Sequence, residues 1–251
     1  MGRLRGKVAV ISGGAGSIGA ATARRFVAEG ARVVITDIDE PGLRAVAADL
    51  GDAAAAHPAD VTDSAQVRAA VDLAVERFGG LDIAFANAGM FGSIAPVAEY
   101  PEDVFDRVIA VNIGGTFRLA RHALAAMRDG GSLILNSSVV GLTSDPGICA
   151  YATSKHALVG LMRTAAKEVA GRGIRVNSLH PGPVDNAFQH TIEVTATGKD
   201  EAGAAAVFEQ MIPLGRHAHP DEIAAAALFL ASDESRFLTG AAVPVDGGMT
   251  V

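Results

Sequence analysis

The sequence predicts an α/β protein with one doubly wound parallel sheet of about seven strands and helices on both faces. Short apolar runs alternate with stretches of helical periodicity along all 251 residues, and many of the 29 glycines fall where an apolar run ends. Strand–helix alternation of this kind is typical of a parallel sheet with helical crossovers. Apolar residues make up 49% and charged residues 20% of the chain, an ordinary globular balance. We therefore expect residues 1–251 to form a single domain.

The first half of the chain supplies the clearest elements. Apolar residues from Val67 to Phe78 recur at helical spacing, which predicts an amphipathic helix. A glycine-rich turn separates the first predicted strand from the first predicted helix. Strands are predicted at residues 7–11, 32–36 and 81–85, and helices at about 17–29 and 67–78.

The second half continues the alternation up to a less regular segment over residues 183–214. Within it, the stretch around residues 185–215 is predicted to be a substrate-binding loop segment. An alanine-rich patch at residues 53–56 is assigned to no element. Helices are predicted at about 102–127, 151–170 and 221–230, and strands at 132–136, 174–179 and 242–245.

A glycine motif joins the first strand to the first helix. Gly14, Gly16 and Gly19 satisfy G-x-G-x-x-G in the strand–turn–helix context that gives the pattern meaning. Such a turn lets a pyrophosphate approach the backbone, and the helix N-terminus offers unpaired N–H groups and a favourable dipole. The triplet also fits a plain tight turn. With this motif the sheet is predicted to be a Rossmann-type dinucleotide-binding domain.

Asp37 indicates which dinucleotide would bind. It lies 21 residues after Gly16, at the carboxyl end of the second strand. An acid there accepts hydrogen bonds from the adenosine ribose hydroxyls. A carboxylate would repel a 2′-phosphate, and no arginine follows Gly14 or flanks Asp37. NAD is therefore predicted rather than NADP; the alternative interpretation of Asp37 is a solvated loop aspartate.

Tyr151 and Lys155 form the most informative pair. Four residues apart on a predicted helix, they project from one face. At a separation of ~5 Å and an effective dielectric of ~20, the ammonium would favour the phenolate by roughly 3 kcal/mol. This predicts a tyrosine pKa of roughly 8, suited to proton exchange with an alcohol. The same spacing also occurs by chance on solvated helices.

Composition excludes several classes of function. The formal charge is −7 and no Lys/Arg run exceeds two residues, which argues against nucleic-acid binding and a polybasic membrane anchor. Cys149 is the only cysteine, so we expect a buried small side chain and no internal disulfide. No apolar run approaches the length of a membrane span, no secretory leader is evident, and no grouping has metal-ligand spacing. A cytoplasmic protein without a metal is predicted.

Together these residues resemble the short-chain dehydrogenase/reductase family over essentially the whole chain. The resemblance implies hydride transfer between a nicotinamide cofactor and a secondary alcohol or ketone. Tyr151 would act as the acid and base, and Ser138 would hydrogen-bond the reacting oxygen. Lys155 would hold the nicotinamide ribose, and Asn112 would position a water linked to Lys155. The implied catalytic residues are Asn112, Ser138, Tyr151 and Lys155.

The resemblance also implies a set of cofactor contacts. Three positions depart from the family pattern: Ser12 replaces a threonine, Ser17 occupies the place of the middle glycine, and Asn186 stands where threonine is common. The implied contacts are Gly13, Gly16, Ser17, Ile18, Gly19, Asp37, Asp60, Val61, Asn87, Gly89, Tyr151, Lys155, Pro181, Gly182 and Val184.

The substrate stays open among sugars, polyols, cyclic alcohols and hydroxysteroids. Its walls are expected after Gly89 (Met90 and Phe91), at residues 140–149, and at residues 185–211, including Phe188, His190, Thr191 and Phe208. One alternative is an NADPH-dependent 3-oxoacyl-[acyl-carrier-protein] reductase, for which Arg128 and Arg172 could form a landing surface. A non-catalytic dinucleotide-binding protein is another. The resemblance also implies a homotetramer.

Overall fold

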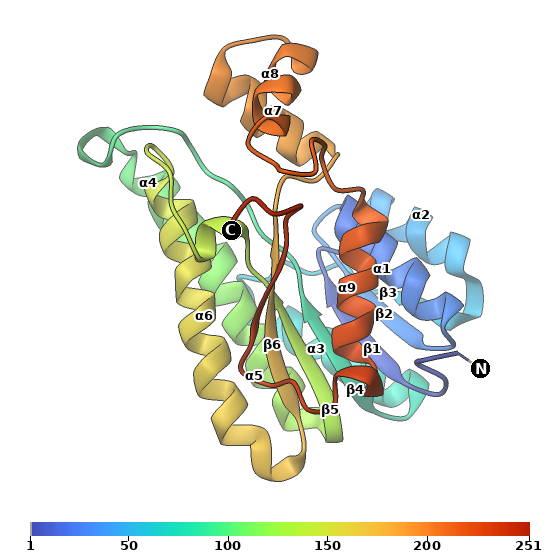
Figure 1. The fold of residues 1–251 in the computed structure, drawn as a ribbon. Helices are drawn as coiled ribbons and strands as arrows, with labels where there is room; N and C mark the ends of the chain where they lie inside the picture. Colours follow the sequence, from blue (N-terminus) through green and yellow to red (C-terminus); the bar gives the residue numbers. More distant parts are fainter. Residues whose placement is uncertain (1) are drawn as a thin grey trace.

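The computed structural model describes residues 2–251, and within them seven strands form one sheet in the order β3-β2-β1-β4-β5-β6-β7 (Figure 1). All neighbouring strands are parallel. The predicted fold class is confirmed. The strands are β1 (Val8–Ser12), β2 (Arg32–Thr36), β3 (Ala54–Ala56), β4 (Leu81–Ala86), β5 (Met127–Asn136), β6 (Arg175–Pro181) and β7 (Ala242–Val245). The helices are α1 (Ser17–Ala28), α2 (Glu40–Leu50), α3 (Ser64–Phe78), α4 (Glu102–Val108), α5 (Thr116–Ala126), α6 (Cys149–Val169), α7 (Ala187–Thr197), α8 (Glu201–Glu209) and α9 (Pro220–Ala231).

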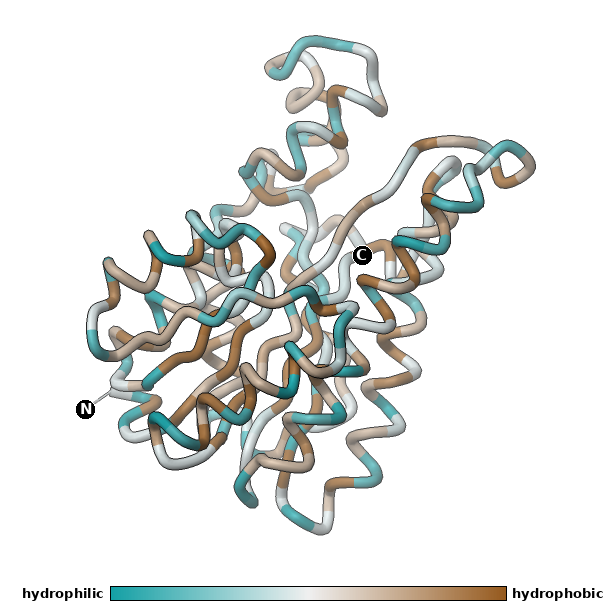
Figure 2. The backbone as a smooth tube through the Cα atoms, turned by 180° about the vertical axis from the view of Figure 1, so that it is seen from behind, coloured by the Kyte–Doolittle hydropathy of each residue, from teal (hydrophilic) through white to brown (hydrophobic). Residues whose placement is uncertain are grey.

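Two hydrophobic layers hold the sheet. Successive strand residues point to opposite faces, so Val8 and Val10 of β1 pack with α3, α5 and α6, whereas Ala9 and Ile11 pack with α1, α2 and α9. Hydrophobic colour gathers on the central strands and hydrophilic colour on the outer turns (Figure 2). Each fully buried Val or Ile contributes roughly 1.5–3 kcal/mol. The two layers therefore supply most of the stability.

The sequence-based prediction of an irregular segment over residues 183–214 is wrong, because most of it is helical. Helices α7 and α8 rise above the carboxyl edge of the sheet (Figure 1). Asn186 caps α7 by accepting from Gln189 N (2.8 Å), and Gly198 ends it in a left-handed conformation. Asp200 caps α8 by accepting from Gly203 N (2.9 Å). Each helix is bounded by local signals.

Four further differences come from local chemistry and packing. Helix α2 was not predicted, although Asp39 caps it and Pro41 lies in its first turn. The alanine patch forms β3, a short edge strand paired with β2. A π-helical turn, Ile109–Gly115, divides the predicted long helix into α4 and α5. Strand β5 begins at Met127 instead of residue 132, with an irregular register against β4.

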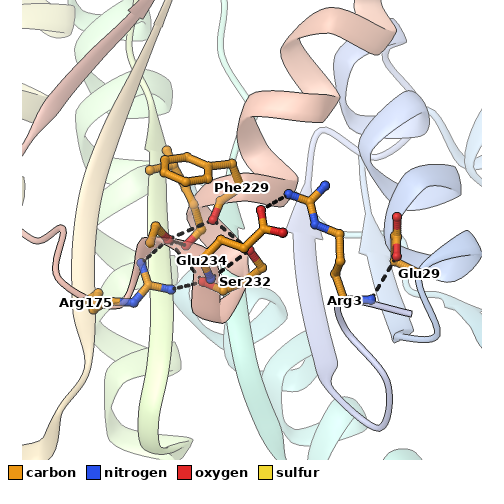
Figure 3. Close-up of polar contacts among 8 residues, drawn as sticks. Arg3, Glu29, Arg175, Phe229, Ser232 and Glu234 are labelled. Atoms are coloured by element: carbon orange, nitrogen blue, oxygen red, sulfur yellow. Dashed lines mark hydrogen bonds and ion pairs between the residues drawn. The ribbon is translucent and has the colours of Figure 1, made fainter. Parts of the chain in front are cut away.

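The amino edge of the sheet is closed by polar contacts (Figure 3). Buried Arg175, at the start of β6, donates to Ser232 O (3.1 Å) after α9. The backbone N of Arg3 donates to Glu29 (2.8 Å), and its side chain pairs with Glu234. These contacts tie β6 to the turn after α9, and the N-terminal segment to the end of α1 and to the same turn.

Candidate active site

A cavity of about 730 Å³ opens at the carboxyl edge of the sheet, where loops from several parallel strands converge. Most of the predicted site residues lie in its wall. Gly19 and Asn112 do not. The predicted residues in the wall are Gly13, Gly16, Ser17, Ile18, Asp37, Asp60, Val61, Asn87, Gly89, Ser138, Tyr151, Lys155, Pro181, Gly182 and Val184.

The glycine turn forms a tight cradle at one part of this wall. A Cβ on Gly19 would overlap the carbonyl oxygen of Gly13 and lie 3.0 Å from Asn87 Nδ2. Gly16 is the N-cap of α1, which has no side-chain cap and no acidic residue in its first turn. The N–H groups at the start of α1 are thus left for an anion in the cavity. The geometry fits a dinucleotide pyrophosphate.

Asp37 lies half-buried in the cavity wall and also fastens the turn. One carboxylate oxygen accepts from Ala15 N (3.1 Å) and the other from Asp39 N (3.1 Å). Of the residues within 2–251 that line the cavity, Lys155 is the only lysine or arginine. The wall beside Asp37 therefore provides no cationic side chain for an additional phosphate.

A chain of hydrogen bonds joins the glycine turn to Lys155. Asn87 Nδ2 donates to Gly13 O (3.1 Å), and Asn136 Nδ2 donates to Asn87 Oδ1 (2.9 Å). Lys155 Nζ in turn donates to the Asn136 carbonyl oxygen (2.8 Å). Ser12 Oγ accepts from Asn87 N (3.1 Å), so its hydroxyl holds the loop after β4. Asn136 is not among the predicted site residues, although it opens the Asn-Ser-Ser run at a strand end.

Asn136 has a second notable property. Its Oδ1 is buried without a hydrogen-bond partner among the described residues, yet the residue lines the cavity. Unpaired buried acceptors are rare in folded proteins.

Tyr151 and Lys155 both enter the cavity from α6, with Lys155 Nζ 5.4 Å from the centre of the Tyr151 ring. Ser138 follows β5 and lines the same cavity. The prediction that the tyrosine and the lysine lie on one face of the helix is confirmed. Ser138 hydrogen-bonds the phenol and so acts to lower its pKa.

The predicted tyrosine pKa of roughly 8 is wrong for this structure. Burial raises the pKa of Tyr151 to about 12, against the smaller effect of Ser138. Burial also lowers the pKa of Lys155 to about 8. Loss of water favours the neutral form of each group. The lysine amine is also bound to the Asn136 carbonyl.

Asn112 lies in the π-helical turn behind the cavity and is 1% exposed. Its Oδ1 accepts from Met90 N (2.8 Å). Its Nδ2 donates to Met90 O (2.9 Å) and Ser154 Oγ (2.9 Å). The side chain therefore ties the loop after β4 to α6. Both of its amide hydrogens are already used by the protein.

The substrate side of the cavity combines the predicted segments with residues that the sequence analysis missed. Met90, Phe91, Phe188 and Phe208 lie in the wall as expected. His190 and Thr191 lie outside it. Asn186, at the threonine position of the family, also lines the wall while it caps α7. Gln189 and Ile192 belong to the predicted segment 185–211, whereas Ile94 and Met249 were not predicted.

A buried acid–histidine pair anchors α7. Glu193 is 1% exposed, and its Oε1 lies 2.6 Å from His217 Nε2. The next residue, Ala218, exchanges backbone hydrogen bonds with Pro183 and Asp185 (both 2.9 Å), just after β6. The pair thus sets where α7 stands relative to the end of β6. Its residues lie too far apart in the sequence for a motif to reveal it.

Three further predictions concern Cys149, metal binding and membrane spans. Cys149 is half-buried rather than buried, because it is the first residue of α6. Over residues 2–251, no three His, Cys, Asp or Glu side chains converge as a metal site would require. No helix in this described part combines the length and hydrophobicity needed to cross a membrane.

Comparisons with known proteins identify the family. Residues 13–250 match the family described as enoyl-(acyl carrier protein) reductase. Momilactone A synthase of Oryza sativa subsp. japonica is 44% identical over 255 residues, covering 99% of this chain and 92% of that protein. The 3-alpha-(or 20-beta)-hydroxysteroid dehydrogenase of Mycobacterium tuberculosis is 42% identical, covering 98% and 90%.

The same family appears among solved structures. An NAD⁺-bound xylitol dehydrogenase superposes with a TM-score of 0.92 at 33% identity, covering 98% of this chain and 99% of that one. Other similar structures hold NADPH or NADH. The glycine turn and the cavity at the sheet edge are consistent with these similarities. The chain belongs to the short-chain dehydrogenase/reductase family of oxidoreductases.

Proposed function

We propose that this protein is an NAD-dependent oxidoreductase that interconverts a secondary alcohol and its ketone. One observation carries the proposal. The glycine turn and Asp37 line the same cavity as Ser138, Tyr151 and Lys155. NAD, when bound, would supply the hydride chemistry. The chain itself would bind and orient the cofactor and the substrate, and it would move the proton.

The proton step would centre on Tyr151. In the oxidative direction the Tyr151 phenolate takes the proton of the substrate hydroxyl and becomes the neutral phenol, while Ser138 hydrogen-bonds the same oxygen. Because burial raises its pKa, Tyr151 is held as the neutral phenol, which cannot accept a proton, and a positive charge beside it lowers that pKa. We therefore expect proton transfer only when the oxidised cofactor is bound. Lys155, whose Nζ donates to Asn136 O (2.8 Å), would hold the nicotinamide ribose.

The preference for NAD rests on charge. Asp37 lines the cavity, and within residues 2–251 that wall contains no arginine and only Lys155 as a lysine. A 2′-phosphate beside Asp37 would meet a carboxylate without a compensating cation. The similar xylitol dehydrogenase contains NAD⁺.

The two alternatives are less well supported. Arg128 is bound to Asp82 (3.1 Å) and Arg172 to Asp129 (2.9 Å), both at the amino edge of the sheet. A carrier protein landing there would face away from the cavity. A non-catalytic binding protein has no need of the tyrosine, lysine and serine that meet in the wall. Turnover measurements separate it from an enzyme.

The test combines a substrate panel with a matched pair of variants. Secondary alcohols are incubated with NAD⁺ or NADP⁺ while NADH or NADPH absorbance is followed. Tyr151→Phe should lower kcat by about 10²–10⁴-fold and leave NADH binding nearly unchanged. Tyr100→Phe is the control, since Tyr100 accepts from Ser93 N (2.9 Å) outside the cavity wall. Turnover that survives Tyr151→Phe would contradict the proposal.

A further inference from the structure

The cavity walls also bear on the chemical class of the substrate. We propose that the substrate is a cyclic secondary alcohol or ketone with a hydrophobic ring body, rather than a sugar or polyol. The inference rests on the proposed function and narrows it.

Apolar side chains from separate parts of the chain surround Tyr151. The Phe91 ring lies 5.2 Å from the Tyr151 ring, tilted by 49°. Ile148, from the loop before α6, and Met249, from the C-terminal segment, join the same hydrophobic cluster and line the cavity. A ring placed with its oxygen at Tyr151 would therefore rest on aromatic, aliphatic and thioether surface.

The cover helices, α7 and α8, extend this surface. Phe188 on α7 and Met211 just after α8 line the cavity, yet they are 44% and 46% exposed. Large apolar side chains left open in a concave wall gain from contact with an apolar ligand. Their exposure is accounted for if a hydrophobic body covers them.

Polar partners on this side are few. Asn186 Oδ1 accepts from Gln189 N (2.8 Å), and Gln189 Nε2 donates to Glu193 (2.9 Å), so one polar group of each amide is engaged by α7 itself. Besides these two amides, Ser138 and Tyr151, the exposed Asp145 carboxylate is the remaining polar side chain on this side of the wall. Each substrate hydroxyl buried without a partner lowers affinity by roughly ten-fold. A polyol carries several such groups, whereas a ring ketone carries none beyond the reacting oxygen.

The experiment compares ketones that differ in hydroxylation. Cyclohexanone, its pentahydroxy analogue inosose, and the bicyclic 2-decalone are titrated against the enzyme with NADH or NADPH bound. Quenching of reduced-cofactor fluorescence in the Tyr151→Phe variant, which should bind without turnover, reports binding, and loss of absorbance with the wild-type enzyme reports reduction. We expect 2-decalone to bind at least about 100-fold more tightly than inosose. Inosose binding as tightly as 2-decalone would overturn the inference.

Matched variants locate the effect. Phe188→Ser and Met211→Ser should each weaken 2-decalone binding by about 5–10-fold and leave reduced-cofactor binding unchanged. Val194→Ser is the control, because Val194 is 38% exposed on the same helix but does not line the cavity. An equal loss in the Val194 variant would also overturn the assignment.

The outcomes separate this inference from the proposed function. Tight binding of 2-decalone, with no reduction of any ketone by either cofactor and no turnover in the alcohol panel, would contradict the oxidoreductase proposal and support the hydrophobic cavity. Preferential binding and reduction of inosose would support the oxidoreductase proposal and contradict the hydrophobic substrate class. Failure of all three ketones to bind would contradict the substrate class alone, because the alcohol panel tests turnover independently.

Discussion

Replacing Gly19 with alanine should damage the fold as well as cofactor binding. The added Cβ would overlap the carbonyl oxygen of Gly13 and lie 3.0 Å from Asn87 Nδ2. The blocking atom belongs to the backbone, so rotating a side chain cannot relieve the overlap. The turn between β1 and α1 must move instead.

The size of the effect follows from three contributions. Forced overpacking costs about 1–3 kcal/mol, and disturbing the 3.1 Å hydrogen bond from Asn87 to Gly13 costs about 1 kcal/mol more. Alanine recovers about 1 kcal/mol of helix propensity in α1. The net loss is about 2 kcal/mol. In a protein of this size it corresponds to a decrease in Tm of about 4–8 °C.

Gly16→Ala is the matched control. Gly16 has φ −69°, which alanine adopts freely, and its Cβ would lie 3.5 Å from Gly13 O, an ordinary contact. We expect the free energy of unfolding to stay within about 1 kcal/mol of wild type. Because the methyl group enters the cavity wall, NADH affinity should still fall.

Thermal unfolding without cofactor and NADH fluorescence titration measure the two effects separately. Gly19→Ala should lose both stability and affinity, and Gly16→Ala affinity alone. A Gly19→Ala protein that unfolds at the wild-type temperature would refute the steric argument. So would a larger decrease in Tm for Gly16→Ala.

Three other predictions concern charge. Burial lowers the pKa of Lys155 to about 8, so above that pH the native state binds fewer protons than the unfolded state. Without cofactor, the free energy of unfolding should therefore rise by on the order of 2 kcal/mol between pH 8 and about 10. Urea titrations at these pH values measure the rise. It should be absent in Lys155→Met. Glu193→Ala removes the 2.6 Å partner of buried His217 and should cost about 3 kcal/mol. Glu193→Gln keeps an acceptor and should lose less; equal losses in urea unfolding would argue against the pair. Asp37→Asn should reduce the preference for NADH over NADPH, measured as the ratio of kcat/KM values, by about ten-fold or more, and an unchanged ratio would place cofactor specificity elsewhere.

Most of the sheet could be predicted because its signals are local. Strands β1 and β2 are apolar runs whose residues are almost all buried, and the turn after β1 carries the glycine pattern. Helices α7 and α8 have local signals too, since Asn186 and Asp200 cap them, but these caps were not interpreted as helix starts. Strand β3 had none, because three alanines form a strand only where β2 offers an edge.

The candidate site divides in the same way. The sequence by itself determined which side chains stand at strand ends and on one face of α6, because backbone periodicity is short-range. The tertiary structure decided the rest: Met249 in the wall, Asn136 between the glycine turn and Lys155, and the raised pKa of Tyr151. Solvent exclusion and contacts between distant segments arise only when the whole chain packs. For that reason the spacing of Tyr151 and Lys155 could be taken from the sequence, whereas the effect of burial on their pKa values could not.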